Sequence, residues 1–353
     1  MTIKRSVLLG SAVLGLLIAV IGVSAFVFAE PYHQRIVFTF MVNLIIVLGL
    51  QVFMGNSDIT HFGHIGFMGI AAYAVAILAT PVAIKKSALA TAPFGLSGIE
   101  FPLPVAILGA IVITMVVAFF VGLVMVRQTG VPATIATLAF LVVVHVILLN
   151  WVDLTRGPRA FYGIPIKASL LGATAIAVVG VLIARLFRDS HWGVQLRASS
   201  EDVAAAAAVG VRMQRLRFAA WMLSAFFLAV AGILFALFVG TISPKSFYFD
   251  LTFLTLAMLI IGGMHSVTGA VVGSIVVALG LEVMRFLENG PEIAGVELPQ
   301  MFGLTGFYLG AVIVLGMAFR SEGIVGPQEI EEWWMRRRQK AKSDATSDEA
   351  LQP

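Results

Sequence analysis

Residues 103–126, LPVAILGAIVITMVVAFFVGLVMV, form an uninterrupted apolar run without a charged side chain. A transmembrane helix needs about 20 such residues to cross roughly 30 Å of hydrocarbon, so this stretch alone predicts a membrane span. The whole chain has the same character, because 59% of its 353 residues are hydrophobic and only 12% are charged. An ordinary soluble domain carries roughly a quarter charged residues. We therefore expect an all-α, polytopic integral membrane protein.

Further apolar runs, bounded by charge or by Pro and Gly clusters, raise the expected number of spans to ten. They cover residues 6–29, 35–54, 61–84, 103–126, 133–151, 169–187, 217–240, 250–263, 267–288 and 300–319. The run 250–263 is short and ends at two glycines, so a half-helix and a span that extends into its neighbours are both open. The first run resembles a signal peptide, but it is longer than the usual hydrophobic region, and we expect a retained helix.

Basic residues are distributed unevenly between the two sides of these spans. If the chain starts inside the cell, 15 of the 23 Lys and Arg residues fall in cytoplasmic segments, seven fall on the opposite face and Arg285 falls within a span. Positive charge is retained on the cytoplasmic side, so we expect both termini in the cytoplasm. The basic residues lie along the inner face of the lipid bilayer and call for no nucleic-acid partner.

The chain is expected to divide into a transmembrane domain, residues 1–319, and a cytoplasmic tail, residues 320–353. The tail carries in order the residues Glu329, Glu331, Glu332, Trp333, Trp334, Arg336, Arg337 and Arg338. An acidic first turn, an aromatic anchor and a basic last turn favour a short interfacial helix on the lipid headgroups, with an ordinary solvated tail as the alternative. Residues 340–353 are polar and are expected to be disordered.

The sequence lacks the motifs of common enzymes. It has no G-x-x-x-x-G-K-[ST] loop for a nucleotide phosphate, no H-E-x-x-H pair, no G-x-S-x-G elbow and no cysteine. We therefore expect a protein that is not an enzyme, binds no cofactor or metal itself, and cannot use ATP on its own.

A polar, arginine-bearing segment, residues 185–217, separates the sixth and seventh spans. Its centre, from Glu201 to Gly210, is rich in alanine and predicts a short helix, with Ser199 or Ser200 as the N-cap and Gly210 at the C-terminal end. The surface of this helix would consist almost entirely of methyl groups, which suits a shallow groove on another protein. From these features alone, docking to a partner and resting on the lipid headgroups are equally supported.

A second polar segment, residues 55–67, lies between two spans with almost no loop. Polar groups at that depth must face protein or water rather than lipid, and we interpret the segment as a glycine-broken entry into the third span. It would either line a translocation path or pack on a neighbouring helix. The candidates for this path are Asp58, Thr60, His61, His64, Gly262, Gly263 and His265. The alternative for the two histidines of the segment is hydrogen bonding to nearby loop carbonyls.

Small residues recur on single helix faces in two parts of the chain. They are Gly63, Gly66, Gly69 and Ala72 in the first part, and Gly269 and Gly273 in the second. Such faces allow helices to approach closely in a membrane. We expect packing within the chain, with a subunit interface as the alternative.

The polar segment and its surroundings resemble a known family. The matching residues include Gly193-Val-Gln-Leu-Arg197, the alanines up to Gly210, Arg215-Leu-Arg217, Ser243-Pro244-Lys245, Gly262-Gly263 and Gly269. The pattern is similar to that of the permease subunits of ABC importers for branched-chain amino acids, specifically the longer of their two related permease types. The resemblance covers roughly residues 36–319.

This resemblance implies a multi-pass permease of the bacterial inner membrane that carries a branched-chain amino acid or a similar small solute inward. Its partners would be a homologous permease or a second copy of the chain, two ABC ATPase subunits that hydrolyse the ATP, and a periplasmic substrate-binding protein. In the family, the glycine-terminated cytoplasmic helix docks onto the ATPase. The residues assigned to coupling on this basis are Arg197, Glu201, Ala205, Gly210, Arg215 and Arg217.

One departure from the family pattern affects the substrate. Asp58-Ile59-Thr60-His61 stands where the family usually has Gly-Gln-apolar-Ser, so the identity of the solute stays open. The alternative function is a stand-alone secondary transporter or channel in which Asp58, His61 and His64 form an ion or proton relay. A membrane scaffold without transport is a third possibility.

Overall fold

The chain folds as a bundle of long helices. The computed structural model describes residues 5–89, 91–290, 292–293, 296–297, 300–319, 323–327 and 329. The elements in chain order are α1 (Arg5–Phe28), α2 (Pro31–Ser57), α3 (His64–Ala79), α4 (Val82–Ala88), η1 (Pro93–Gly98), α5 (Leu103–Met125), α6 (Gly130–Asn150), α7 (Val152–Thr155), β1 (Phe161–Tyr162), α8 (Leu170–Asp189), α9 (His191–Glu201), α10 (Val203–Ala208), α11 (Met213–Val239), β2 (Thr241–Ile242), η2 (Pro244–Phe247), α12 (Phe249–Gly262), α13 (Val267–Glu288), β3 (Glu292–Ile293), β4 (Val296–Glu297) and α14 (Leu304–Phe319). The strands of the described residues form two short antiparallel pairs, β1 with β2 and β3 with β4, and the fold is all-α.

Ten of these helices coincide with the ten predicted spans. They are α1, α2, α3, α5, α6, α8, α11, α12, α13 and α14. Within the described residues, eight helical segments are long and apolar enough to cross a membrane on their own, and α3 joined to α4 makes a ninth. The remaining helix, α14, is apolar over its 16 residues.

Two of the predicted spans differ in detail from the helices. The third prediction, 61–84, is wrong at its end, because α3 stops at Ala79 and the chain bends by 115° into α4. Thr80 precedes Pro81 and takes an extended conformation, with ψ of 136°, as the residue before a proline prefers. The short run 250–263 extends into its neighbour, since η2 precedes α12 and the combined segment Pro244–Gly262 has 19 residues.

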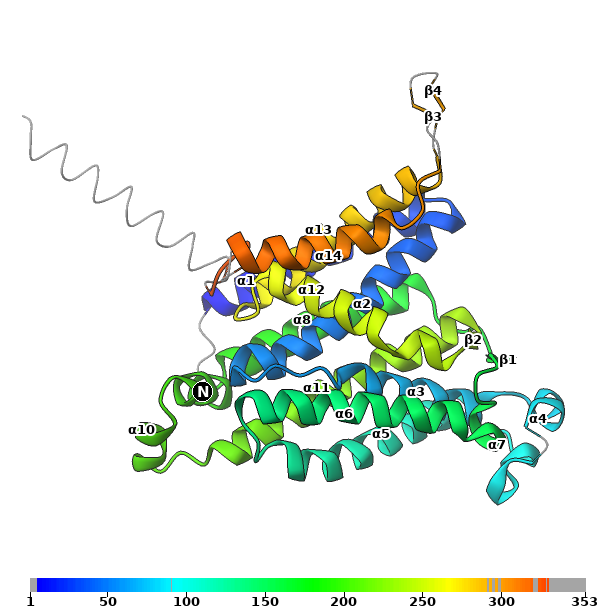
Figure 1. Cartoon of the computed structure of the whole chain (residues 1–353), viewed down its shortest axis with the longest axis horizontal. Helices are drawn as coiled ribbons and strands as arrows, with labels where there is room; N and C mark the ends of the chain where they lie inside the picture. Colours follow the sequence, from blue (N-terminus) through cyan, green and yellow to red (C-terminus); the bar gives the residue numbers. More distant parts are fainter. Residues whose placement is uncertain are drawn as a thin grey trace, which may run out of the picture.

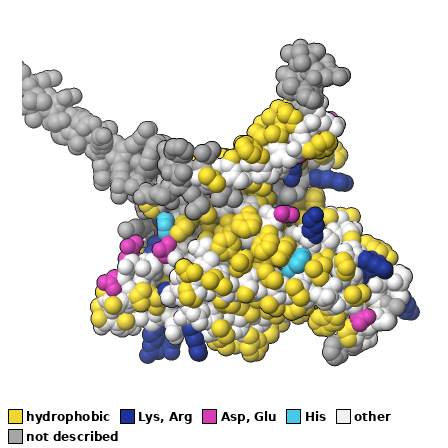
Figure 2. All heavy atoms as spheres, in the orientation of Figure 1, with side chains coloured by type: hydrophobic (Ala, Val, Ile, Leu, Met, Phe, Trp, Pro, Cys, Tyr) yellow, Lys and Arg dark blue, Asp and Glu magenta, His cyan; other side chains and the backbone are white. Residues whose placement is uncertain are grey.

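Helices α2 and α11 lie at the centre of the bundle. Figure 1 shows α13 and α14 on one side of them and α5 and α6 on the other. In the apolar stretch of α2, 83% of the residues are buried, compared with 22% in α5 and 28% in α6. The outward side chains of α5 are apolar, such as Leu108 and Phe120, so this surface suits hydrocarbon rather than water. Figure 2 shows the matching pattern, with hydrophobic side chains across the middle and many of the charged ones towards the two ends.

The spans alternate in direction, which gives the bundle two distinct ends. We call them the α9–α10 end and the β1–β2 end, after the elements found there (Figure 1). Helix α1 runs antiparallel to α8, with Gly15 beside Val178 and Gly22 beside Thr174. The start of α1 therefore lies at the α9–α10 end, and so does Val325, whose N–H bonds to the carbonyl of Gly262. These two segments lie at the same end of the bundle because the chain crosses the bundle an even number of times between them. That this end faces the cytoplasm stays a prediction from the basic residues.

The predicted small-residue faces pack within the chain. Gly66 leaves room for the ring of Phe140 in α6, since a methyl group on this glycine would lie 3.0 Å from a carbon of that ring. Gly69 leaves room for Phe247 in η2, whose Cβ would lie 3.1 Å from a methyl group on this glycine. In α12 and α13, a methyl group on Gly262 would collide with the carbonyl of Gly269. Such close contacts replace the hydrophobic effect as the source of helix association in a membrane.

Candidate coupling site

Helices α9 and α10 connect the spans α8 and α11, and each helix has its own N-terminal cap. The hydroxyl oxygen of Ser190 accepts a hydrogen bond from the N–H of Gly193 at 3.2 Å and caps α9. One carboxylate oxygen of Asp202 accepts the N–H groups of Ala204 and Ala205, each at 2.9 Å, and caps α10. The polar segment is therefore two short helices with a break at Asp202.

The predicted start of the alanine helix is wrong by a few residues. Ser199 and Ser200 lie in the last turn of α9, where their hydroxyls donate to carbonyl oxygens three residues earlier. Asp202 is the cap because its backbone is extended, and a carboxylate is also favoured by the positive end of the helix dipole. The predicted end is confirmed, since Gly210 follows the last turn with φ of 82°, a conformation that favours glycine.

The surface of α10 is open. None of its residues is buried: Val203, its first residue, is 53% exposed, and Val209, which follows its last residue, is 79% exposed. Ala205 and Gly210, both assigned to coupling from the sequence, are exposed as well, and no atom lies within 4 Å of the position that a Cβ on Gly210 would take. Alanine and valine side chains at this density present a smooth apolar patch without any hydrogen-bonding group of their own.

Four arginines surround a cavity next to this patch. The cavity has a volume of about 370 Å³, and its lining includes Val203 of α10 together with Arg127, Arg212, Arg215 and Arg217. The lining contains no acidic residue. None of the four arginines forms an ion pair with another residue of the described chain, and Arg217 is only 6% exposed, with an Nε that has no hydrogen-bond partner there. We call Arg127, Arg212, Arg215 and Arg217 the open arginines.

Arg197, which the sequence assigns to coupling, connects α9 to the spans. Its guanidinium donates to the side-chain oxygen of Asn56 at 2.6 Å and to the carbonyl oxygen of Arg188 at 2.8 Å. Asn56 belongs to the last turn of the central helix α2, and Arg188 to the last turn of α8. Glu201, in contrast, is exposed at the end of α9. Arg197 thus links the exposed helices α9 and α10 to the ends of α2 and α8 in the bundle.

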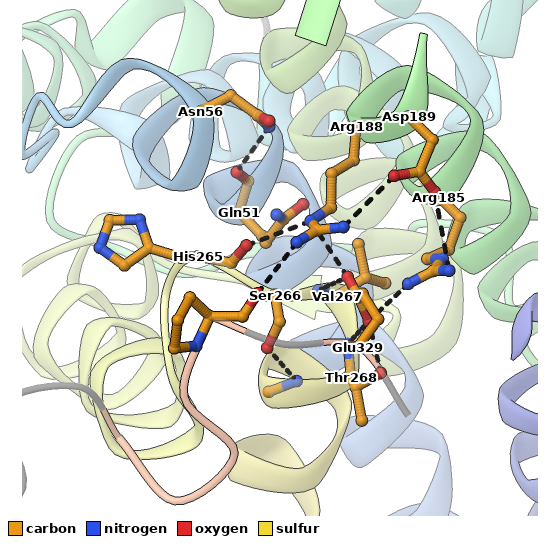
Figure 3. A network of polar contacts seen from close by, with 12 residues as sticks. Gln51, Asn56, Arg185, Arg188, Asp189, His265, Ser266, Val267, Thr268 and Glu329 are labelled. Atoms are coloured by element: carbon orange, nitrogen blue, oxygen red, sulfur yellow. Dashed lines mark hydrogen bonds and ion pairs between the residues drawn. The ribbon is translucent and has the colours of Figure 1, made fainter. Parts of the chain in front are cut away.

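A buried ionic network links Arg188 to the first turn of α13 (Figure 3). The carboxylate of Glu329 lies between the guanidinium groups of Arg185 and Arg188, with the Arg188 Nε at 3.1 Å. The same carboxylate accepts the N–H groups of Val267 and Thr268, at 2.9 and 3.1 Å, in the first turn of α13. Arg188 also donates to the carbonyl oxygen of His265 in the break before α13. One acidic residue therefore joins the ends of α8 and α13.

The environment of Glu329 favours its charged form. Burial alone would raise the pKa of this carboxyl, but Arg188, Arg185 and the hydrogen bonds from Thr268 and Val267 outweigh burial and hold the pKa below its usual value. The prediction that Glu329 begins an interfacial helix on the headgroups is wrong, since the residue is 1% exposed. Two guanidinium groups and a helix N-terminus attract the carboxylate more strongly than a lipid surface. Glu331 to Arg338 and the final residues of the tail lie outside the described residues.

Asn56, Arg188 and Glu329 were not predicted to be members of the site. A signal was present, because Arg185 and Arg188 stand one helical turn apart at the end of an apolar span and need a counter-charge. The acidic partner lies about 140 residues further along the chain, and no local pattern connects the two.

The candidate path residues occupy different environments. His61 and His64 are buried and their rings lie 5.9 Å apart, whereas Asp58 and Thr60 are exposed. His64 bonds to the carbonyl of His61 at 3.1 Å and to the hydroxyl of Thr255 at 2.9 Å. The loop-carbonyl alternative therefore holds for His64. No hydrogen bond or ion pair of the described structure links Asp58 to either histidine.

The remaining path candidates lie in the break between α12 and α13. Gly262 allows the close approach of Gly269, and Gly263 has φ of 114°, which a side chain would strain. His265 is half-buried and contributes its carbonyl to Arg188, as described above. These three residues thus form one group with the ionic network, and His61 with His64 forms another. A role of either group in translocation stays a prediction.

The architecture defines the class of protein. A polytopic helical bundle with an exposed apolar helix at one end has the architecture of an integral membrane protein. The described residues contain no group of His, Cys, Asp or Glu that could hold a metal ion.

The chain belongs to the family described as branched-chain amino acid transport system / permease component, which matches residues 32–317. It is therefore the permease component of an ABC transporter and a multi-pass protein of the bacterial inner membrane. The family implies that ATPase and binding-protein subunits work with it.

Individual relatives agree with this assignment but differ in substrate. The high-affinity branched-chain amino acid transport system permease protein LivM of Escherichia coli is 27% identical over 320 residues, which cover 81% of this chain and 68% of LivM. LivM of Salmonella typhimurium is 26% identical over the same share of each chain. The autoinducer 2 import system permease protein LsrC of Salmonella paratyphi B is 30% identical over 187 residues, 50% of this chain and 52% of LsrC. No solved structure matches the chain.

Proposed function

We propose that this chain is the permease subunit of an ATP-driven importer that carries a branched-chain amino acid or a similar small solute into the cell. The observation that carries the coupling part of the proposal is the exposed apolar surface of α10 beside four arginines without acidic partners. The solute is supported by the LivM relatives, which cover more of the chain than LsrC does.

The complex would contain two ABC ATPase subunits, a homologous permease or a second copy of this chain, and a periplasmic substrate-binding protein. Helix α10 would occupy a shallow apolar groove of an ATPase. The open arginines predict acidic residues at the rim of that groove, since complementary charge fixes the register of an interface.

The contacts of α9 suggest how movement of the ATPases would reach the spans. Closure of the ATPase pair on ATP would shift α10 and, through Arg197, the ends of α2 and α8. Arg188 would pass the shift to the break before α13. ATP binding would thereby favour one of two conformations of the spans, which is the differential affinity that a coupled switch requires.

The test compares Ala205→Glu with Ser87→Glu in the complete transporter. Ser87 is exposed in α4 at the β1–β2 end and supplies a matched charge far from α10. We expect Ala205→Glu to insert into the membrane normally but to lose ATPase co-purification and ATP-driven uptake into proteoliposomes, because a carboxylate is costly in an apolar groove. Ser87→Glu should keep both. Normal uptake by Ala205→Glu would refute the docking assignment.

The rival function is testable in the same system. Liposomes that contain this chain alone should show no uptake when a proton or sodium gradient is imposed. Gradient-driven uptake under these conditions would instead support a secondary transporter that uses His61 and His64.

A further inference from the structure

The β1–β2 end of the bundle contains a large cavity that is separate from the coupling site. Its volume is about 720 Å³, within the ~300–1,000 Å³ typical of small-molecule sites. The walls come from α2, α3, α11, η2, α12, α13 and α14. None of the residues assigned to a translocation path from the sequence lines this cavity. We call it the mixed-charge cavity, for the residues described next.

Three charged side chains of both signs line this cavity without pairing to one another. Arg35 comes from the start of α2, Lys245 from η2 and Asp250 from the first turn of α12, and all three side chains are exposed. None of them forms an ion pair within the described part of the chain. Glu282 and Arg285, which line the same cavity, do pair with each other at 2.7 Å. Figure 2 shows basic and acidic side chains together in the notch between the α13–α14 side and the rest of the bundle.

Deeper in the cavity, the wall is apolar except for one amide. Asn43 lies in the middle of α2, is 7% exposed, and forms no side-chain hydrogen bond with another described residue. Met68 and Met258 lie beside the cavity and are fully buried in the bundle. A polar side chain without a protein partner inside a membrane bundle faces water or a solute, since a polar group against hydrocarbon is unfavourable.

We propose that the mixed-charge cavity binds the zwitterion of an amino acid with an apolar side chain. Asp250 would accept the ammonium group, Arg35 and Lys245 would bind the carboxylate, and the half-buried side chains of Leu251 and Leu254 in the cavity wall would receive the apolar side chain. The proposal rests on the importer function proposed above. It adds that the permease itself selects solutes by charge, in addition to the separate binding protein.

The separation of the charges argues for a small ligand rather than for a structural role. Opposite charges that stabilise a fold pair directly, as Glu329 does with Arg185 and Arg188. Arg35, Lys245 and Asp250 come from three elements, converge on one cavity and stay apart. A ligand with one positive and one negative group satisfies both sets at once, whereas a simple anion would leave Asp250 opposed to it.

Direct binding to the purified complex, without the binding protein, tests the proposal. Radiolabelled leucine would be measured by equilibrium dialysis, in competition with leucinamide, which lacks the carboxylate, and with 4-methylpentanoate, which lacks the amino group. We expect leucine to bind and both analogues to compete about tenfold more weakly, because each loses a charge-assisted contact. Absence of leucine binding, or equal competition by the analogues, would overturn the proposal.

Variants separate the two ends of the ligand. Asp250→Asn should weaken leucine binding about tenfold and abolish the preference for leucine over 4-methylpentanoate, a change in selectivity that a merely structural role would not produce. Lys86→Gln removes an exposed cation outside the cavity and should bind leucine like the wild type. Unchanged selectivity in Asp250→Asn would also overturn the proposal.

The importer function is checked separately by ATP-driven uptake with the binding protein present. If the wild type imports leucine but the complex without the binding protein binds none, this inference fails and the importer function stands. If the wild type neither imports nor co-purifies with ATPases, the importer function itself fails.

Discussion

Two sets of arginines at the α9–α10 end differ in whether they form ion pairs within the chain. Arg185 and Arg188 are buried and share the carboxylate of Glu329, with Asp189 as a second acidic neighbour. The open arginines surround a cavity without acid and form no ion pair within the described chain. The residue type and the end of the bundle are the same, but the counter-charge differs and so does the burial of most of the side chains.

The difference distinguishes arginines that stabilise the fold from arginines that are available to another subunit. We call Arg185 and Arg188 the framework arginines and the open arginines the interface arginines. A buried charge without a partner would cost several kcal/mol, so the chain supplies Glu329 to Arg185 and Arg188 itself. Arg127, Arg212 and Arg215 are exposed, so they keep their hydration and are available to acidic groups of another molecule. Arg217 is buried, and its Nε has no hydrogen-bond partner in the described part of the chain. Arg35, Lys245 and Asp250 of the mixed-charge cavity are likewise exposed and form no ion pair within the described part of the chain. In this protein, paired charges hold helices together, and unpaired charges mark places where we expect something else to bind.

The largest effect is expected from breaking the paired set. Glu329→Gln keeps the shape and one acceptor oxygen but leaves two buried guanidinium groups without their anion. We expect a loss of about 3–5 kcal/mol in the free energy of unfolding, the usual cost of removing one partner of a buried ion pair. The measurement is unfolding in mixed micelles followed by tryptophan fluorescence.

A surface pair provides the control for this measurement. Glu282→Gln removes the partner of Arg285, which is 54% exposed, and should cost less than about 1 kcal/mol. If both substitutions lowered the free energy of unfolding by the same amount, burial would not determine how much an ion pair contributes to the stability of this protein.

A second, smaller effect follows from the lowered pKa of Glu329. A carboxyl with a lowered folded-state pKa stabilises the protein fully above its unfolded pKa, about 4.3, and loses this contribution as the pH falls towards the folded value. The wild type should therefore lose stability below about pH 4.3, and the difference between wild type and Glu329→Gln should shrink there. Unfolding curves recorded from pH 7 downwards provide the measurement. A constant difference over this range would contradict the assignment of a charged Glu329.

The paired set also shows the limit of prediction from the sequence. Membrane spans follow from composition and length, so ten apolar runs correspond to ten helices. The end of α3 was misplaced because a single Thr80-Pro81 step outweighed the apolar character of the following residues. The cap of α10 was misplaced because Asp202 and the two preceding serines compete locally, and the backbone conformation decides between them.

Contacts between distant segments were beyond the sequence patterns. Glu329 looked like part of an amphipathic tail, and only the tertiary fold brings it between α8 and α13. Similarly, Arg197 was assigned to coupling, but its hydrogen bonds to Asn56 and Arg188 could not be predicted from the sequence. The helix around Ala205 and its end at Gly210 were easier to predict, because alanine content and a terminal glycine are local signals. The role of these two residues in coupling stays a prediction.

The smallest effect on stability is expected from the open arginines, and it completes the comparison. Arg215→Gln removes an exposed charge that has no partner within the described chain, so the free energy of unfolding should change by no more than about 0.5 kcal/mol. The same substitution should weaken the association of the permease with its ATPase subunits, because complementary charge across the interface is lost. The loss should diminish at high salt, where such attractions are screened. Affinity of detergent-purified permease for the ATPases, measured by surface immobilisation at low and high salt, gives the result. If Arg215→Gln lowered stability as much as Glu329→Gln while leaving ATPase affinity unchanged, the division between framework and interface arginines would be wrong.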